Sequence, residues 1–305
     1  MNRRSFRTIG RVFWLLAGLH RFGFPAEQAT VIILGSGTPI PDPRTAGPSV
    51  AIVVHGRAYL FDAGAGVVRR AEEAADRYHM PALEAPNLTR LFLTHLHSDH
   101  TLGYADLILT PWVTGRRQAL EVFGPRGTAA MTKHLKQAYR DDIGMRSQGL
   151  EHLDPAGLRV DVHEISAGPV YRDGNVSVRA IPVRHGSWTQ AFGYAVEAGG
   201  RTIVISGDTS PCDSIAEACQ GCDVLVHEVY SARRFGQMAP AVQRYHAAFH
   251  TSTRELAAIA ARSKPKVLVL YHQLYFGPRD GVDLENEVRQ LYSGRVVSSR
   301  DLDVF

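Results

Sequence analysis

Residues 94–101 carry three histidines and one aspartate within six positions: His95, His97, Asp99 and His100. Neutral imidazole and carboxylate are ordinary ligands of zinc and related divalent ions, whereas burying such a cluster without a partner is costly. His95 and His97 are two residues apart, so an extended backbone directs both side chains to one side. If a helix begins next, Asp99 and His100 project from the other side of the same pocket. The spacing therefore predicts two adjacent metal positions.

The elements that must position this cluster follow from the apolar pattern. The run Leu91–Leu93 directly before it is typical of a buried strand. Further strands are predicted at residues 31–34, 50–54, 58–61, 119–123, 158–162, 176–183, 191–196, 202–206, 224–229 and 267–271. Helices are predicted at residues 67–77, 102–110 (ended by Pro111), 128–139, 214–219, 252–263 and 284–292.

The pattern His-x-His-x-Asp-His resembles the signature of the metallo-β-lactamase superfamily. The resemblance implies an α/β fold, the four-layer αββα sandwich, and strand-rich halves that each carry helices point the same way. It also implies that Asp62, at a strand end, supports the metal loop by hydrogen bonding. A helix N-cap is the alternative role for this aspartate.

Three later residues, each at the end of a predicted strand, complete the metal site that the resemblance implies. They are His185, Asp208 and His272. One ion would be held by His95, His97, His185 and Asp208, and the other by Asp99, His100, His272 and Asp208. Two such ions share a water, lower its pKa and stabilise an oxyanion. We expect two Zn²⁺, although this donor set also accepts Mn²⁺ or Fe.

Three further motifs are similar to those of the ribonuclease Z-like branch, including its arylsulfatase-like members. They are Ser206–Thr209, Val226–Glu228 and His250–Glu255. In that branch, the residues matching Glu228 and His250 form a pair that assists proton transfer to the leaving oxygen. His246 competes with His250 for this role. Asp99 is expected both to bind metal and to orient the attacking hydroxide.

One departure from ribonuclease Z concerns the long glycine-rich arm that grips tRNA. Here residues 197–200 alone connect two predicted strands, which leaves no room for it. Five of the 34 basic residues lie within residues 1–22, which hold no acid, so the remaining 29 nearly balance the 30 acidic residues. Both observations argue against tRNA as a partner and favour a small anionic phosphodiester or sulfate ester. A tRNA 3′-processing endoribonuclease is the alternative, followed by a lactonase or β-lactamase and by a non-catalytic metal-binding protein.

Residues 29–305 are expected to form one hydrolase domain after an extension of residues 1–28. Asn2–Phe6 fits the core of a twin-arginine export signal, and the apolar run after it is too short to span a membrane. We therefore expect a cytoplasmic protein, with periplasmic export as the alternative. The pair Cys219 and Cys222 is interpreted as a helix end running into a buried strand. The pattern does not indicate an oligomeric state, and a homodimer is compatible with it.

Overall fold

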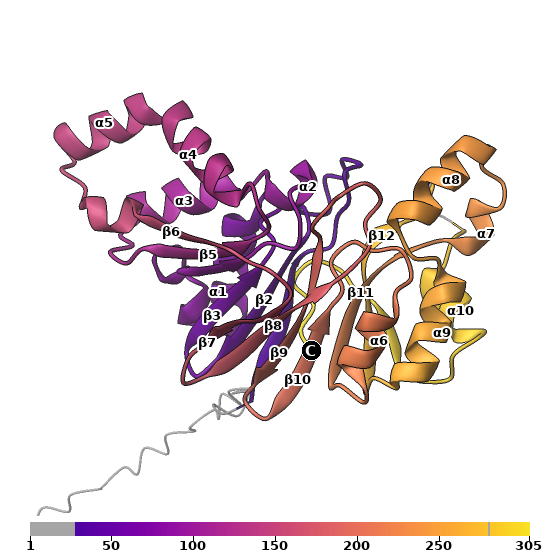
Figure 1. Cartoon of the computed structure of the whole chain (residues 1–305). Coiled ribbons are helices and arrows are strands. Elements are labelled where there is room, and N and C mark those ends of the chain that lie inside the picture. Colours follow the sequence, from indigo (N-terminus) through magenta and orange to yellow (C-terminus); the bar gives the residue numbers. More distant parts are fainter. Residues whose placement is uncertain (1–27, 280) are drawn as a thin grey trace, which may run out of the picture.

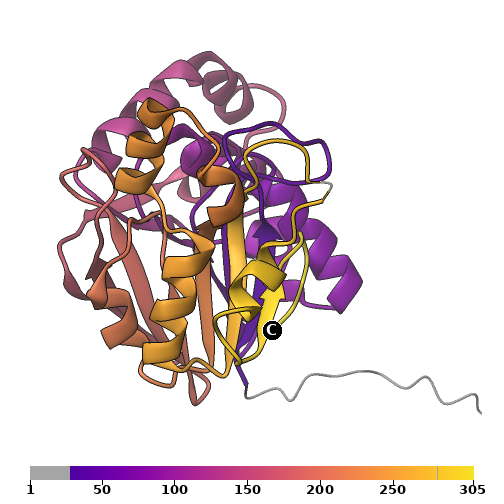
Figure 2. The same cartoon turned by 90° about the vertical axis from the view of Figure 1, so that its right-hand side faces the viewer.

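Two mixed β-sheets lie face to face, with helices on both outer faces, in the computed structural model (Figures 1 and 2). The structure describes residues 28–279 and 281–305. This is the four-layer αββα sandwich, and the predicted fold class is confirmed. Nearly all of the expected N-terminal extension, with its possible export signal, lies outside the described residues. Within the described ranges, no helix is both long and apolar enough to cross a bilayer.

The first sheet has six strands, antiparallel at one edge and parallel at the other. In sheet order they are β1 (Thr30–Gly35), β2 (Ser49–Val54), β3 (Arg57–Phe61), β4 (Arg90–Phe92), β5 (Leu120–Gly124) and β6 (Val160–Glu164). The helices of this half are α1 (Val67–Tyr78), α2 (Ser98–Thr101), α3 (Tyr104–Val113), α4 (Thr128–Ala138) and α5 (Arg140–Gln148), with 3-10 turns at Pro81–Leu83, Ala85–Asn87 and Pro155–Leu158. In Figure 1, α4 and α5 project from the sandwich.

The second sheet has seven strands. In sheet order they are β13 (Val296–Ser298), β12 (Val267–Leu274), β11 (Val224–Tyr230), β10 (Arg201–Ile205), β9 (Phe192–Ala198), β8 (Val176–Pro182) and β7 (Gly168–Arg172). The helices of this half are α6 (Asp213–Cys219), α7 (Ala232–Phe235), α8 (Pro240–Phe249), α9 (Thr253–Ser263) and α10 (Leu284–Arg289). The helices α7 and α8 form a second projection, opposite α4 and α5 (Figure 1). The elements β7, β13, α5, α7 and α8 were not predicted.

Three apolar clusters fill the three interfaces between the four layers. One lies between the sheets and contains Ile33 and Val226. A second packs the first sheet against α1 and α3, and a third packs the second sheet against α6, α9 and α10. Every residue of β1, β2, β11 and β12 is buried, because these strands are covered on both faces. Their continuous apolar runs are the reason that the sequence located them.

The predicted end of a helix at Pro111 is wrong, since α3 continues to Val113. Proline removes the N–H that would bond to the carbonyl of Leu107, four residues earlier. The buried guanidinium of Arg116 donates to that oxygen at 2.9 Å and to the carbonyl of Ile108 at 2.8 Å. Its remaining bonds also go to carbonyls, those of Leu88 and Gly157. Arg116 thus replaces the hydrogen bond that the proline removes.

Replacing Arg116 by methionine is expected to destabilise the protein by about 3 kcal/mol, because several buried carbonyls lose their donor. Burial lowers the pKa of Arg116 to about 10, so it stays charged at neutral pH. The free energy of unfolding in urea measures the effect. Arg117→Met, at the exposed next position, is the matched control and should change it by less than about 0.5 kcal/mol. Similar values for the two variants would remove the role given to Arg116.

The connection between β9 and β10 is a tight hairpin turn. Arg201 pairs directly with Ala198, so only Gly199 and Gly200 lie between the strands. Both glycines have positive φ values, 52° and 72°. This turn conformation favours glycine, because a residue with a side chain would be strained in it. The predicted absence of an arm at this position is therefore confirmed.

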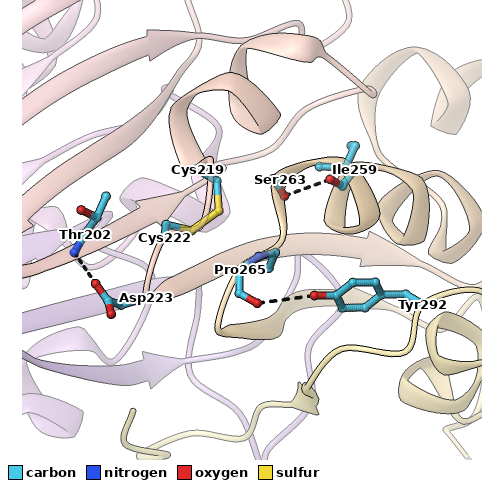
Figure 3. Close-up of a disulfide and its surroundings, with 8 residues drawn as sticks. All are labelled: Thr202, Cys219, Cys222, Asp223, Ile259, Ser263, Pro265 and Tyr292. Carbon is cyan, nitrogen blue, oxygen red and sulfur yellow. Dashed lines mark hydrogen bonds between the residues drawn. A yellow bond between two sulfur atoms is a disulfide. The ribbon is translucent and has the colours of Figure 1, made fainter.

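A disulfide joins Cys219 and Cys222 (Figure 3). Both cysteines are buried, with Cys219 at the end of α6 and Cys222 in the turn before β11, so the interpreted helix end is confirmed, whereas the sequence did not indicate the disulfide. Beside them, the Asp223 carboxylate accepts a hydrogen bond from the N–H of Thr202 (Figure 3). The pair therefore lies in a structural corner of the second sheet.

The C-terminal residues extend the first sheet beyond β1. The N–H of Val31 donates to the carbonyl of Phe305 at 3.0 Å, and the N–H of Phe305 donates back to Val31 at 2.9 Å. Nearby, the Asp301 carboxylate accepts from the N–H and hydroxyl of Ser36 and from the N–H of Ala46. The segment after β13 therefore closes the free edge of the first strand and holds the loop that follows it.

Candidate metal centre

The seven predicted metal ligands come together where the two sheets meet, although they are spread over most of the chain. Each lies at or just after a strand end or in the short helix α2. His95 and His97 follow β4, Asp99 and His100 lie in α2, His185 follows β8, Asp208 follows β10, and His272 lies in β12. They form two groups of donor atoms, and a third group joins Asp208 and His272 with His250.

The first group joins three imidazoles. His97 Nδ1 lies 3.0 Å from His95 Nε2 and 3.0 Å from His185 Nε2. Burial lowers the pKa of His95 well below its usual value and that of His185 to about 4. These rings are therefore neutral near pH 7, which is the form that binds a metal ion.

The second group contains Asp99, His100 and His272. Asp99 Oδ2 lies 3.1 Å from His272 Nε2 and 3.5 Å from His100 Nε2. Asp208 Oδ2 lies 3.4 Å from His100 Nε2, 3.5 Å from His272 Nε2 and 3.9 Å from His185 Nε2. The Asp208 carboxylate therefore stands between the two groups, where a bridging ligand would.

Unpaired buried atoms test whether the site fits a cation. His100 Nε2 and Asp208 Oδ1 are buried and have no hydrogen-bond partner. An orphaned buried carboxylate oxygen is costly unless a cation neutralises it. Although burial raises the pKa of Asp208, the charges of His272 and His100 bring it well below its usual range, so the side chain is anionic. The donor set fits divalent ions such as zinc.

A bulge in the second sheet turns His272 into the site. Opposite β11, Glu228 pairs with Tyr271 and Val229 pairs with Gln273, so His272 is skipped in the ladder. Its φ is 43°, a left-handed backbone conformation that is uncommon outside glycine. Bulges often re-aim a side chain beside a functional site, and here the bulge presents an imidazole to Asp99 and Asp208.

Asp62 supports the metal loop, as the resemblance implied. Its carboxylate accepts hydrogen bonds from the backbone N–H of Thr94 at 2.8 Å and from the Thr94 hydroxyl. It also lies 2.8 Å from His100 Nδ1, which fixes the opposite nitrogen toward Asp99. The alternative role as a helix cap is not observed, because Gly66 stands at the N-cap of α1.

Glu228 and His250 lie next to the second group. Glu228 Oε2 is 3.4 Å from His250 Nδ1, and Glu228 Oε1 accepts the backbone N–H of Thr251 at 2.8 Å. Burial, and then the charge of Asp208, raises the pKa of Glu228 well above its usual value, while burial lowers that of His250 to about 4. The competing His246 packs its ring on Phe276 instead, at 4.6 Å. Glu228 Oε2 and His250 Nδ1 therefore face each other at 3.4 Å, although neither atom makes a hydrogen bond.

Sequence reasoning missed three aromatic residues at this site, Trp188, Tyr245 and Phe249, which we call the aromatic wall. The indole Nε1 of Trp188 donates to His97 Nε2 at 2.8 Å. The carbonyl of Phe249 accepts from His185 Nδ1 at 2.8 Å. Only the position of Trp188, three residues after a predicted ligand, could have drawn attention to it.

Comparisons with known proteins agree with the fold. A model of the beta-lactamase superfamily domain matches residues 57–273. Ribonuclease Z of Mycobacterium bovis (strain BCG / Pasteur 1173P2) is 35% identical over 280 residues, which cover 89% of this chain and 96% of that protein. Ribonuclease Z of Mycobacterium marinum is 34% identical over 279 residues, with the same coverage.

Two solved structures show the same architecture. A metallo-beta-lactamase fold protein from Bacillus subtilis has a TM-score of 0.69 at 18% identity and covers 91% of this chain and 98% of its own. The short form of human tRNase Z has a TM-score of 0.66 at 23% identity and covers 90% and 98%. At these identities the likeness shows the fold alone.

The expectation that tRNA is not a partner is wrong, because the relatives at 35% identity are ribonucleases Z. That expectation rested on the missing arm and on the near-neutral charge. The 280 aligned positions span almost all of the mycobacterial protein, which leaves no room for a long insertion there either. Net charge also averages over the whole surface, whereas phosphate binding depends on local basic patches.

Proposed function

We propose that the chain, which belongs to the beta-lactamase superfamily and within it to the ribonuclease Z family, is a metal-dependent endoribonuclease. It would hydrolyse a phosphodiester bond at the 3′ end of precursor tRNA. One observation carries the proposal. Seven histidine and aspartate donors and the Glu228–His250 pair converge in a chain that is 35% identical to ribonuclease Z over 280 residues.

We propose that the two donor groups hold two zinc ions, with Mn²⁺ or Fe as alternatives for the same ligand types. Two divalent ions bound there would lower the pKa of a water molecule and stabilise negative charge on the phosphate. The protein keeps the donors in place: Asp62 and Thr94 hold the metal loop, and the bulge holds His272. Asp99 would bind an ion and accept a hydrogen bond that aims the attacking oxygen.

The Glu228–His250 pair supports proton transfer to the leaving oxygen. The Glu228 side chain faces His250 Nδ1, so in its ionised form it would stabilise the protonated imidazole and fix its orientation. Because Glu228 Oε1 already accepts the Thr251 N–H, the carboxylate is held in one position. The opposite ring nitrogen of His250 is then available to the substrate.

A substrate panel tests the proposal. The zinc-loaded protein should cut precursor tRNA at its 3′ trailer and should lose this activity with a chelator and regain it with zinc. The comparison substrates are a nitrophenyl phosphodiester, an aryl sulfate, a lactone and nitrocefin, which represent the other ester classes expected from the sequence. If the protein hydrolyses an aryl sulfate or a small diester but leaves precursor tRNA uncut, the result would contradict the proposal and favour a small-ester hydrolase.

The proposed substrate implies a cytoplasmic protein. The Cys219–Cys222 disulfide is the observation that favours export, since disulfides are rare in reducing compartments. Cell fractionation with antibody detection distinguishes the two locations. Protein found mainly in the periplasm would contradict both the location and the tRNA substrate.

A further inference from the structure

The aromatic wall borders the first donor group on the side of His97. The ring centroid of Trp188 lies 5.2 Å from that of His97, and the Phe249 ring lies 6.4 Å from His97, nearly parallel at 19°. Tyr245, one turn earlier in α8, stacks on Phe249 at 4.5 Å and 23°. Phe249 and Tyr245 therefore continue from the ring of a predicted metal ligand to the surface, and Trp188 flanks the same ligand.

The wall is fixed to the loop that carries His185. The Gly186 N–H donates to the carbonyl of Ala248 at 3.0 Å, and Phe249 contacts the His185 ring edge-on at 5.0 Å. Gly186 has a φ of 53°, and a Cβ at this position would overlap the Phe249 ring. Only glycine allows this close approach, so the end of α8 packs directly on the loop that carries His185.

Core packing does not account for these side chains. None of the three belongs to the apolar clusters that join the layers of the described residues. The helix α8 buries none of its residues, and Tyr245 exposes 50% of its surface. A stacked aromatic pair held at the mouth of a polar site leaves a flat face open to a ligand.

Two exposed arginines are chain neighbours of the wall and of the donor groups. Arg244 is exposed on α8 directly before Tyr245. Arg184 is exposed directly before His185, and its guanidinium donates to the carbonyl of Pro211. Sites for single-stranded nucleic acid combine a positive surface, which attracts phosphates, with aromatic rings on which bases stack.

We propose that the aromatic wall, with Tyr245 at its open end, is a stacking subsite for a nucleobase of single-stranded RNA next to the phosphate at the metal centre. The inference rests on the proposed function and adds to it a base-binding subsite. A nucleobase matches both features of the surface, since its flat face fits the rings and its phosphate fits the arginines. Stacking is tolerant of base identity, so the subsite would hold RNA without reading its sequence.

The test is the binding of a fluorescein-labelled, six-nucleotide single-stranded RNA with phosphorothioate linkages to the full-length zinc-loaded protein, followed by anisotropy. Tyr245→Leu should raise Kd about tenfold, because one base stacked on an aromatic ring contributes an effect of this size. An abasic version of the oligonucleotide should bind wild type and Tyr245→Leu with equal Kd. Binding of the RNA with bases should also quench the fluorescence of Trp188, and Trp188→Phe should lose this signal.

Tyr139→Leu is the matched control, because Tyr139 is also an exposed tyrosine, 44% accessible, but lies between α4 and α5. It should leave Kd unchanged. Equal Kd for Tyr245→Leu and wild type, with equal thermal midpoints, would overturn the subsite even if precursor tRNA is cleaved. Tyrosine-dependent binding without any RNA cleavage would instead contradict the proposed function and leave the subsite standing. Absence of both binding and cleavage would overturn both.

Discussion

Replacing Asp208 by alanine should reduce bound zinc from about two equivalents per chain to one or none and should lower kcat/KM on a phosphodiester by roughly a thousandfold or more. The physical reason is the central position of this carboxylate. Its Oδ2 lies between 3.4 and 4.0 Å from five imidazoles, two in each donor group and that of His250. Without it, neither group keeps a full ligand set or a negative charge to offset the ions.

Metal analysis of the purified protein and hydrolysis of a nitrophenyl diester measure this effect. A third readout is thermal unfolding, since an ion that binds only the folded state stabilises it. A chelator should lower the melting temperature of wild type clearly and that of Asp208→Ala only slightly. Asp213→Ala, at an exposed position on α6, is the control and should behave as wild type. Full zinc content and unchanged activity in Asp208→Ala would refute the bridging role.

His250→Ala should slow substrates with poor leaving groups by roughly a hundredfold to ten-thousandfold and nitrophenyl substrates far less. An alkoxide leaving group needs a proton in the transition state, whereas nitrophenolate is stable without one. Glu228→Gln should show the same selectivity with a smaller loss, because Glu228 acts through His250. The rates on a series of diesters with graded leaving groups measure both losses. Equal losses across the series would assign His250 a structural role.

The pH dependence of this prediction follows from the burial of His250. Because burial lowers its pKa to about 4, the imidazole is mostly neutral at pH 7, and its proton-donating form becomes more abundant as pH falls. The ratio of rates on poor and good leaving groups should therefore rise from about pH 8 to pH 6 in wild type and stay flat in His250→Ala. The ratio cancels any metal loss at low pH, because both substrates share that loss.

The ligand positions could be predicted because each donor interrupts a strongly apolar pattern. His185 and Asp208 follow the ends of β8 and β10, and strand ends in one sandwich meet at a common edge. His272 was predicted to follow a strand that ends at residue 271, whereas β12 continues to Leu274. Sequence could not predict which nitrogen of each ring faces the site, or that a bulge turns His272 inward. Those depend on hydrogen bonds such as the one that His100 Nδ1 donates to Asp62 and on the register of β11 against β12.

The aromatic wall could not be predicted, for two physical reasons. The helix α8 carries apolar residues at helical spacing, Val242, Tyr245 and Phe249, but it buries none of its residues, so this short stripe does not mark a core-facing helix. Trp188 lies after β8 and Phe249 ends α8, and only the fold brings both rings to His97. The predicted helix end at Pro111 was wrong for a different reason. Proline locally favours the end of a helix, but the guanidinium of Arg116, from outside the helix, bonds to the carbonyl that the proline leaves free.

The pairing of β1 with residues 301–305 has a consequence for folding during synthesis. Asp301 binds Ser36 across a separation of 265 residues, so this contact carries a very high contact order. While the ribosome is still making the second sheet, β1 keeps one edge of unpaired backbone groups, which is a template for pairing with another chain. A nascent chain stalled before residue 301 should therefore aggregate through β1. This strand is synthesised before the other strands of the sheets, but it gains its outer partner only when the C-terminal residues are made.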